Sequence, residues 1–467
     1  MVAYPLAAGI DRIFDPAVGS GAFFRAAKAV ASMLGRDVEL AGTELYPKIL
    51  DEARASGLTD EDLSRVEIGD FPLRPLQDRL PAVVANPPYI RHHRLAPDLK
   101  QYLRGLSANI LRFEIDGRAG LHVYFFVTAF ALLERGGRLA FIMPADTCEG
   151  VFAPALWRWI AERYRIDAVV AFAPECTPFP GVDTNAVVFF IRNDAPDNEL
   201  RWARCAKRRD ELLRWVLEGF PSSFPGLEIH RGELREALAT SLSRPPRIED
   251  PDTIPLRELV EIRRGIATGA NEFFFLTRSR AVELGIPQEF LVPAVGRTRD
   301  VPGELITLQT LDDLDRAGWL TLLLSLDGRL VEEFPETVRE YIRIGEKLGL
   351  LPDRALLRTR RPWPRMETRT PPPFLFAYLG RRNTRFIRNL AGVVPLTGFL
   401  CVYPRNTDPC WIDCLWDILR STAVLEHLPW VGKSYGDGAI KVEPRSLERL
   451  PIPRRLLSEL RSLNLAA

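Results

Sequence analysis

The segment Asn86-Pro87-Pro88-Tyr89 has residue types that could act chemically on an amino group. The amide oxygen of Asn86 and the carbonyl oxygen of Pro87 are two acceptors that can be aimed at both N–H bonds of one planar nitrogen. Accepting both bonds pushes that nitrogen towards sp3 geometry and localises its lone pair for in-line attack on a methyl group. The prolines fix φ and hold the acceptors in place beforehand, and Tyr89 offers a face on which an extruded base can stack. A Pro-Pro pair can also simply end a strand. The residues around this segment therefore decide whether it is a catalytic segment or an ordinary strand end.

A second candidate is the stretch Asp15–Phe23, which reads DPAVGSGAF. A strand that ends in an acid and runs into glycines opening a helix brings the backbone close to a small ligand. GSG flanked by an acid differs from the GxGxxG of dinucleotide sites, and an acid facing the pocket suits a ligand with an ammonium and a sulfonium. We therefore expect a cofactor-binding turn here, although the stretch alone could equally be an ordinary strand-to-helix turn. Its expected ligand contacts are Asp15, Pro16, Ala17, Gly19 and Gly21.

Two further acids follow the next predicted strands. Glu44 ends the second strand, where a carboxylate can bind ribose hydroxyls, and Asp70-Phe71 follows the third. At the third strand a carboxylate can accept from an adenine amino group while the phenyl ring packs against the base. Either acid alone could be a solvated loop charge. Three acids at three consecutive strand ends, on the carboxyl edge of one sheet, favour a nucleotide-like cofactor.

The elements that must position these residues alternate between apolar runs and helical patterns over residues 10–195, which predicts a parallel sheet wrapped by helices. Strands are expected at 13–14, 38–43, 65–68, 81–85, 138–143, 166–172 and 185–192, and helices at 23–34, 47–56, 121–134 and 153–164. The last two strands, joined by a Pro-rich loop, are expected to form an antiparallel hairpin at the sheet edge. The stretch between residues 90 and 120 is expected to be irregular, with Pro97–Lys100 in a loop.

The pattern of residue types changes along the second half of the chain. Residues 193–198 are polar and contain a proline, residues 206–218 form a charged helical pattern, and from residue 254 short strands and Arg/Pro-rich loops prevail. We predict an α/β domain over 1–195, a connector over 196–254, and a C-terminal α+β domain over 255–467.

Charge in the C-terminal part is clustered, although the net charge of the chain is only +1. Residues 352–388 contain ten arginines against two acids, interleaved with aromatic residues. Such a cluster can supply phosphate contacts and guanine readout on double-stranded DNA, whereas any single arginine could be solvated or ion-paired. The expected DNA contacts are Arg358, Arg360, Arg361, Arg365, Arg381 and Arg382.

Several other function classes are disfavoured by the composition. The six cysteines form no CxxC pair, which is typical of a reducing compartment and indicates the cytoplasm. No apolar stretch is long enough to cross a membrane, and the first residues lack the basic region of a secretory signal. Adjacent side chains such as His92 and His93 point apart, and no Cys/His/Asp set has ligand spacing, so we expect no metal site.

Taken together, DPAVGSGAF, Glu44, Asp70-Phe71 and NPPY resemble the amino-methyltransferases. More closely, the chain resembles the gamma-class DNA adenine-N6 methyltransferases of TaqI-like architecture, in which the recognition domain follows the catalytic one. The resemblance covers nearly the whole chain. It implies a Rossmann-like methyltransferase domain, a C-terminal target-recognition domain, S-adenosylmethionine as cofactor, and methylation of a flipped adenine in duplex DNA by a restriction-modification enzyme.

The resemblance also implies roles for two aromatic side chains. Phe125 falls where the family places a ring against the cofactor adenine, and Phe179 would form, with Tyr89, the walls around the flipped base. His122 stands where a tyrosine is common.

One departure concerns the start of the chain, because family members usually carry a helix and a Thr-Pro loop that close over the methionine end of the cofactor. Only 14 residues precede Asp15 here, so we expect a pocket that is open on one side. An upstream subunit or a separate nuclease is a conceivable partner of what we expect to be a monomer. Two alternatives stay open: a non-catalytic or partner-dependent DNA-binding fragment, and an amino-methyltransferase acting on RNA or on a protein glutamine.

Overall fold

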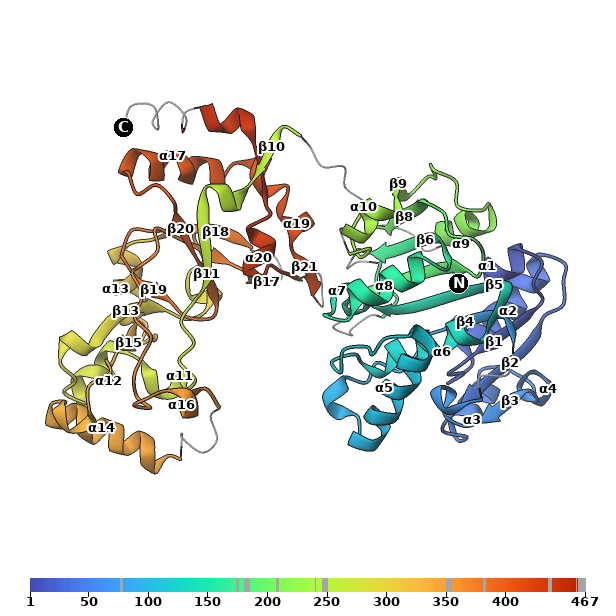
Figure 1. Ribbon diagram of the computed structural model, residues 1–467, viewed down its shortest axis with the longest axis horizontal. Helices are drawn as coiled ribbons and strands as arrows, with labels where there is room; N and C mark the ends of the chain where they lie inside the picture. The colour runs from blue at the N-terminus through green and yellow to red at the C-terminus, as the bar shows by residue number, and fades with distance from the viewer. Residues whose placement is uncertain are drawn as a thin grey trace. The chain divides into compact units, whose positions relative to one another are not determined.

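The computed structural model divides the chain into two compact units (Figure 1). The first comprises Met1–Glu249 with Ser434–Gly438, and the second Asp250–Lys433 with Ala439–Ala467. The structure describes all residues except 76–78, 174–175, 180–184, 207–209, 240, 246–250, 350–354, 381–383, 436–438, 459 and 461–467. Arg381 and Arg382, two of the predicted DNA contacts, lie outside the described residues.

A nine-stranded sheet forms the centre of the first unit, in the order β3-β2-β1-β4-β5-β7-β6-β8-β9. The strands from β3 to β5 are all parallel, β7 runs antiparallel to both β5 and β6, β8 is parallel to β6, and β9 is antiparallel to β8. The predicted mostly parallel α/β fold is therefore confirmed. The strands are β1 (Arg12–Asp15), β2 (Glu39–Glu44), β3 (Val66–Ile68), β4 (Leu80–Ala85), β5 (Leu133–Pro144), β6 (Arg165–Phe172), β7 (Ala186–Arg192), β8 (Glu199–Cys205) and β9 (Leu227–Glu233).

Helices cover both faces of this sheet, and successive strand residues point to opposite faces. In β1, Ile13 packs into one hydrophobic core and Phe14 into the other, and in β5 the same holds for Ile142 and Phe141. One core is built with α1 (Ala3–Ala7), α2 (Ala22–Met33), α3 (Ile49–Ala55), α4 (Asp60–Leu63) and α9 (Asp210–Leu217). The other is built with α5 (Pro97–Leu111), α6 (Leu121–Leu132), α7 (Asp146–Glu149), α8 (Ala153–Ala161) and α10 (Leu234–Ala239).

The expectation of an irregular stretch between residues 90 and 120 is wrong. After the short 3-10 helix η2 (His92–Arg94), Pro97 opens the 15-residue helix α5, so Pro97–Lys100 is not a loop. Proline is tolerated at the first helical position because its missing N–H would have no helical partner there. Leu103, Ser107 and Leu111, four residues apart, form the buried side of α5. One narrow stripe of this kind in a polar helix gives only a weak signal in the sequence.

The antiparallel pairing of the two strands at 166–172 and 185–192 is present, but these strands do not form the sheet edge. Residues 199–233, expected within a connector, add β8 and β9 beyond β6. Leu200 and Trp202 of β8 are buried against the core, and the indole N–H of Trp202 donates to the carbonyl of Leu242 at 2.9 Å. Charged residues between the apolar ones masked this strand in the sequence.

The second unit is an α+β structure with small sheets. A five-stranded sheet has the order β11-β20-β16-β18-β14, and a four-stranded sheet the order β12-β15-β13-β19. Phe374 of β16 stacks on Trp416 of α17, with ring centroids 5.8 Å apart, which packs this helix against the five-stranded sheet. The strands are β10 (Thr253–Pro255), β11 (Val260–Arg264), β12 (Phe275–Leu276), β13 (Leu291–Val295), β14 (Leu305–Ile306), β15 (Leu322–Leu324), β16 (Phe374–Ala377), β17 (Leu379–Gly380), β18 (Arg385–Asn389), β19 (Val394–Pro395), β20 (Phe399–Pro404), β22 (Ala439–Lys441) and β23 (Pro451–Pro453). The helices are α11 (Asn271–Phe274), α12 (Arg278–Glu283), α13 (Leu308–Arg316), α14 (Glu336–Lys347), α16 (Ala355–Thr359), α17 (Pro409–Leu419), α18 (Thr422–Leu425), α19 (Leu428–Val431) and α20 (Pro444–Leu447).

Candidate active site

The carboxyl edge of four neighbouring parallel strands collects the residues that the sequence singled out. Asp15 is the last residue of β1, Glu44 the last of β2, and Asn86 the first after β4. Asp70 follows β3 by two residues. The strand order β3-β2-β1-β4 places these ends side by side, so the predicted acids and the Asn86 segment share one edge of the sheet. In open α/β sheets this edge is where ligands bind.

The turn after β1 is fastened to the end of β2 by its backbone. The N–H of Val18 donates to the carbonyl of Thr43 at 3.1 Å, and the Thr43 hydroxyl donates to the carbonyl of Pro16 at 2.8 Å. Gly21 has φ of +75°, and a Cβ there would lie 2.3 Å from Cδ1 of Leu58. Glycine is therefore required at Gly21 both by the backbone conformation and by the packing.

Glu44 orients this turn with its side chain. One carboxylate oxygen accepts from the N–H of Gly19 at 2.8 Å, and the other accepts from the N–H of Tyr46 at 2.9 Å. The Glu44 side chain is largely buried, with 8% of the residue exposed. The sequence pattern identified Glu44 as a ligand contact but gave no sign that it also binds the glycine turn. Each oxygen retains an acceptor site beyond the bond to the backbone.

Asp15 is a buried carboxyl without a cationic partner in the part of the chain that the structure describes. It accepts one hydrogen bond of 3.0 Å, from the N–H of Ala17. Burial raises the pKa of Asp15 to about 7; the Ala17 bond opposes this shift and the nearby charge of Glu44 adds to it. A cation that enters the site would stabilise the ionised form of this buried carboxyl and so lower its pKa.

Phe71 and Phe125, predicted to contact the same ligand ring, lie against each other with ring centroids 5.5 Å apart. Phe71 opens the 3-10 helix η1 (Phe71–Leu73) after β3 and also contacts Phe14, whereas Phe125 comes from α6. Both residues are buried, at 1% and 4% exposure, so each can offer only a small part of its surface to a ligand. Asp70, beside them, is half-buried, and this burial raises its pKa.

The Asn86 segment leaves its first side chain free. Asn86 is exposed, and its amide makes no hydrogen bond to any residue that the structure describes. Pro87 is buried, and the Tyr89 hydroxyl donates to the carbonyl of Ile142 on β5 at 2.9 Å. The segment is thus anchored at its far end, while the amide that would accept from a substrate has no competing partner.

The ring of Tyr89 contacts two other rings, both nearly perpendicular to it. His122 is 5.8 Å away at an interplanar angle of 81°, and Phe179 is 6.2 Å away at 87°. A base stacked between Tyr89 and Phe179 needs two parallel faces about 7 Å apart, twice the usual stacking contact. The structure therefore brings the two predicted walls together, but in an edge-to-face arrangement that holds no base.

His122 packs behind the segment, in the first turn of α6. It is 8% exposed, both ring nitrogens lack a hydrogen-bond partner within the described residues, and burial lowers its pKa to about 4. A Cβ on Gly120 would lie 2.8 Å from Cε1 of His122 and 2.9 Å from the carbonyl oxygen of Ile90. Gly120 therefore permits the close approach of α6 to the segment, a role that a glycine directly before a predicted helix could have suggested.

Comparisons with known proteins point to restriction-modification methylases. The Eco57I restriction-modification methylase family matches residues 75–179, and the family of the C-terminal domain of the type II methyltransferase M.Eco57I matches residues 246–466. The chain is 22% identical over 446 residues to the type II methyltransferase M.AccI of Acinetobacter calcoaceticus. It is 27% identical over 464 residues to the type II methyltransferase M.XamI of Xanthomonas campestris pv. amaranthicola. These alignments cover 94% and 95% of the chain and 80% of each relative.

The chain belongs to the type II restriction-modification methylase family. The first family match contains the Asn86–Tyr89 segment together with α5 and α6, and the second covers nearly all of the second unit. In a solved structure, the type IIL restriction-modification enzyme MmeI in complex with DNA, the similarity covers 95% of this chain with a TM-score of 0.58 and 13% identity. That similarity concerns the fold, and the chain spans 63% of the length of MmeI.

In the second unit of this methylase, the predicted arginines divide into two groups. Arg360 donates to the carbonyl of Ala267 at 2.6 Å and lies over the ring of Phe274, and Arg361 donates to the carbonyl of Arg358 at 2.7 Å. These two side chains are tied to their own unit. Arg358 and Arg365 are exposed, and neither forms an ion pair within the described part of the chain.

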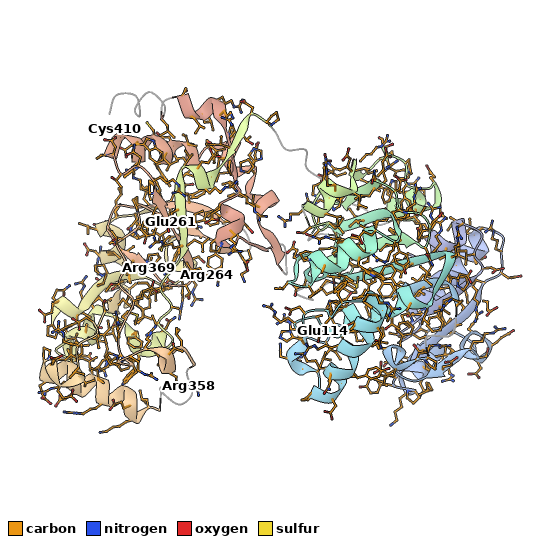
Figure 2. The ribbon with its side chains drawn as sticks, viewed as in Figure 1. Glu114, Glu261, Arg264, Arg358, Arg369 and Cys410 are labelled. Carbon is orange, nitrogen blue, oxygen red and sulfur yellow. The ribbon has the colours of Figure 1, made fainter. Side chains whose placement is uncertain are left out.

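Other arginines of the same basic stretch form contacts within the second unit of the methylase. Arg369 binds the Glu367 carboxylate and the carbonyl of Arg264, and Figure 2 shows Arg264 and Arg369 close together. Arg388 forms an ion pair with Asp413. Part of the excess positive charge is therefore engaged in internal contacts, so a count of arginines overstates the charge available to a partner.

No set of three His, Cys, Asp or Glu side chains gathers as a metal-ligand cluster among the residues described. The rings of His92 and His93 are perpendicular, with centroids 5.4 Å apart. Of the helices that the structure describes, none combines the length and the apolar character needed to cross a lipid bilayer.

Proposed function

We propose that this methylase transfers a methyl group from S-adenosylmethionine to N6 of an adenine that is flipped out of duplex DNA. The observation that carries the proposal is the exposed, unbonded amide of Asn86, placed at the sheet edge that also holds Asp15 and Glu44. Family membership supports methyl transfer within a restriction-modification system. The choice of an amino nitrogen follows from the two acceptors of the Asn86 segment.

The residues at the edge fit the proposed cofactor. Asp15, buried and lacking a cation, would bind the ammonium group, and Glu44 would bind the ribose hydroxyls with the acceptor sites that its backbone bonds leave free. Asp70 would accept from the adenine amino group, with the edges of Phe71 and Phe125 against the ring. S-adenosylmethionine, when bound, supplies an electrophilic methyl group on a sulfonium.

The Asn86 segment would orient the target nitrogen. The Asn86 amide oxygen and the Pro87 carbonyl each accept one N6–H bond, which localises the nitrogen lone pair in the direction of attack, and Pro88 restrains the backbone between the acceptors and the ring. Tyr89, held by the carbonyl of Ile142, presents its ring to the extruded base. The anchor at Tyr89 and the strand end at Ala85 hold the backbone on both sides of the segment, so the Pro87 carbonyl has little need to reorganise during the reaction.

The two units would have different functions, catalysis and target recognition. Residues 1–195, extended by β8 and β9, would form the catalytic domain, and residues 255–467 the target-recognition domain. Arg358 and Arg365, exposed and free of ion pairs in the described residues, are the best-placed phosphate contacts among the predicted arginines.

The test is to incubate the purified chain with tritiated S-adenosylmethionine and, separately, duplex DNA, RNA and a protein extract. We expect label in DNA alone, and methylated adenine at a defined sequence when that DNA is read by a modification-sensitive method. Label in cytosine, in RNA or in protein would contradict the proposal, as would the absence of transfer by a chain that binds both DNA and cofactor.

A further inference from the structure

The first unit carries a basic segment of its own, directly after Tyr89. Residues 90–112 contain five cations and a single acid, Asp98, although the whole chain has a net charge of only +1. The cations are Arg91, Arg94, Lys100, Arg104 and Arg112. This segment was not among the predicted DNA contacts, which all came from the C-terminal half of the chain.

Most of this charge is not neutralised within the protein. Arg91, Arg94 and Arg112 are exposed, and within the described residues none of them forms an ion pair or a side-chain hydrogen bond. Arg104 is the exception, because it pairs with Glu114. Arg91 directly precedes η2 and Arg94 is its last residue, and only Ile90 separates Arg91 from Tyr89 in the chain.

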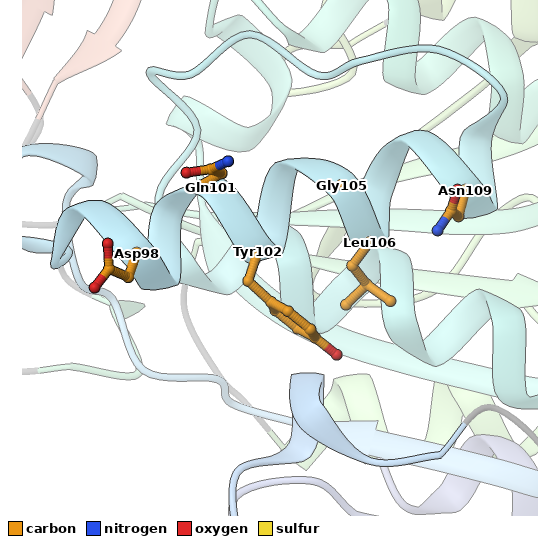
Figure 3. Close-up of a pocket in the computed structure, with 6 residues that line it drawn as sticks. All are labelled: Asp98, Gln101, Tyr102, Gly105, Leu106 and Asn109. Atoms are coloured by element: carbon orange, nitrogen blue, oxygen red, sulfur yellow. The ribbon is translucent and has the colours of Figure 1, made fainter.

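The outer face of α5, the helix that follows η2 in the chain, is also exposed. It lies opposite the buried stripe of Leu103, Ser107 and Leu111 and is hollowed by a pocket of about 490 Å³. Tyr102, 48% exposed, and Leu106 project from this face (Figure 3). The pocket is lined by Asp98, Gln101, Tyr102, Gly105, Leu106 and Asn109. The face thus offers amide donors and acceptors beside an aromatic ring.

We propose that η2 and the outer face of α5 form a DNA-binding surface on the catalytic unit itself. This surface binds the duplex beside the target base. Arg91 and Arg94 contact backbone phosphates, and the face bearing Gln101, Tyr102 and Asn109 lies against the duplex. The inference rests on the proposed function, because that function makes DNA the substrate. Two observations favour DNA as the occupant: the positive charge without ion pairs among the described residues, and the position of Arg91 directly after Tyr89 and Ile90 in the chain.

Phosphate contacts fix the register of a protein on a duplex without reading its sequence. Placed two and five residues after Tyr89, the contacts of Arg91 and Arg94 would hold the backbone on one side of the extruded nucleotide and so keep its amino group in reach of Asn86. The arginines of the second unit would then be free to serve recognition of the remaining base pairs.

The double variant Arg91→Ala/Arg94→Ala tests the phosphate contacts. Each lost contact lowers the slope of log affinity against log salt by about 0.9, so two losses weaken DNA binding roughly 30-fold at 0.15 M salt. The matched control is Arg135→Ala/Arg158→Ala, which removes the same charge at two exposed positions that form no ion pair within the described residues. We expect the control to bind DNA within threefold of the wild type, and both variants to bind S-adenosylmethionine as the wild type does. An equal loss in both variants, or none in the first, would overturn the inference.

The pair Gln101→Glu/Asn109→Glu tests the face of α5. Both positions are exposed and helical, and glutamate is a good helix former, so the fold should be retained. Two new negative charges against the duplex should weaken binding at least tenfold, whereas unchanged binding would show that this face points away from DNA. Failure of the wild type to methylate any DNA would instead contradict the proposed function, and the two failures are thereby distinguished.

Discussion

The carboxylate of Glu44 accepts a hydrogen bond of 2.8 Å from the backbone N–H of Gly19, which ties the end of β2 to the glycine turn after β1. The same side chain accepts from the N–H of Tyr46. One residue therefore shapes the turn and faces the proposed ribose site at once. A substitution at Glu44 should affect both stability and cofactor affinity, and the two effects can be separated.

We expect Glu44→Ala to unfold more easily by about 2 kcal/mol, because two backbone N–H groups lose their acceptor. Glu44→Gln keeps one side-chain oxygen and should lose about half as much. Both variants should bind S-adenosylmethionine at least tenfold more weakly, since neither offers a carboxylate to the ribose. Chemical denaturation and calorimetric titration measure the two effects; wild-type affinity in Glu44→Gln would show that the ribose lies elsewhere.

The pKa of Asp15, about 7 in the folded protein, predicts a pH dependence with opposite signs for stability and for binding. Because the folded pKa lies above the ordinary value of 3.8, protonated Asp15 stabilises the fold at low pH, and this contribution is lost as pH rises from about 4 to about 7. A cationic ligand instead requires the anion, so its affinity should rise up to tenfold per pH unit between 5.5 and 7. Above that range the amino group of the ligand begins to lose its own proton.

Calorimetric titration of S-adenosylmethionine at a series of pH values measures this trend. The variant Asp15→Asn, which is nearly the same size, should bind weakly and without the rise below pH 7. Parallel pH profiles for the wild type and Asp15→Asn would show that Asp15 does not meet the ammonium group.

Replacement of Asn86 by alanine should abolish methyl transfer and leave binding intact. The side chain is exposed and makes no hydrogen bond within the described residues, so its removal leaves no buried group unsatisfied. The loss of one preorganised acceptor lowers the rate of transfer about 100- to 1,000-fold. Single-turnover transfer from labelled cofactor gives the rate, and DNA and cofactor titrations should stay within threefold of the wild type. A variant that transfers at more than a tenth of the wild-type rate would refute the assigned role.

Two glycines provide a paired test of the turn. Gly35, at φ of +64°, has nothing within 4 Å of an added Cβ, whereas a Cβ on Gly21, at φ of +75°, would lie 2.3 Å from Leu58. Gly35→Ala should therefore cost about 1 kcal/mol of stability from backbone strain alone. Gly21→Ala should cost a further 1–3 kcal/mol, approximately, because Leu58 must move, and it should also weaken cofactor binding. Equal losses in thermal unfolding would mean that the turn tolerates a side chain.

Much of the candidate site could be predicted from the sequence because its residues sit at strand ends, and strand ends are visible as the limits of short apolar runs. Asp15, Glu44 and Asn86 follow such runs, and the parallel topology then places them together. The helix α5 was missed because a proline opens it and its buried stripe is narrow. The bond between Glu44 and Gly19 and the angle between Tyr89 and Phe179 depend on side-chain placement, which spacing along the chain does not determine.

If Tyr89 and Phe179 enclose a flipped base as proposed, their perpendicular contact means that base binding depends on how often one of the two rings turns. A nucleotide can be sandwiched only by molecules in which one of the two rings has turned, and the apparent affinity falls in proportion to the fraction of such molecules. If one molecule in a hundred has the turned ring, the protein gives up a factor of one hundred in affinity, about 2.7 kcal/mol. A base that stays paired inside the duplex does not stack on these rings, so rotation of a ring does not strengthen its binding. Under the proposed function, the perpendicular arrangement of these two rings would therefore select for a fully extruded base.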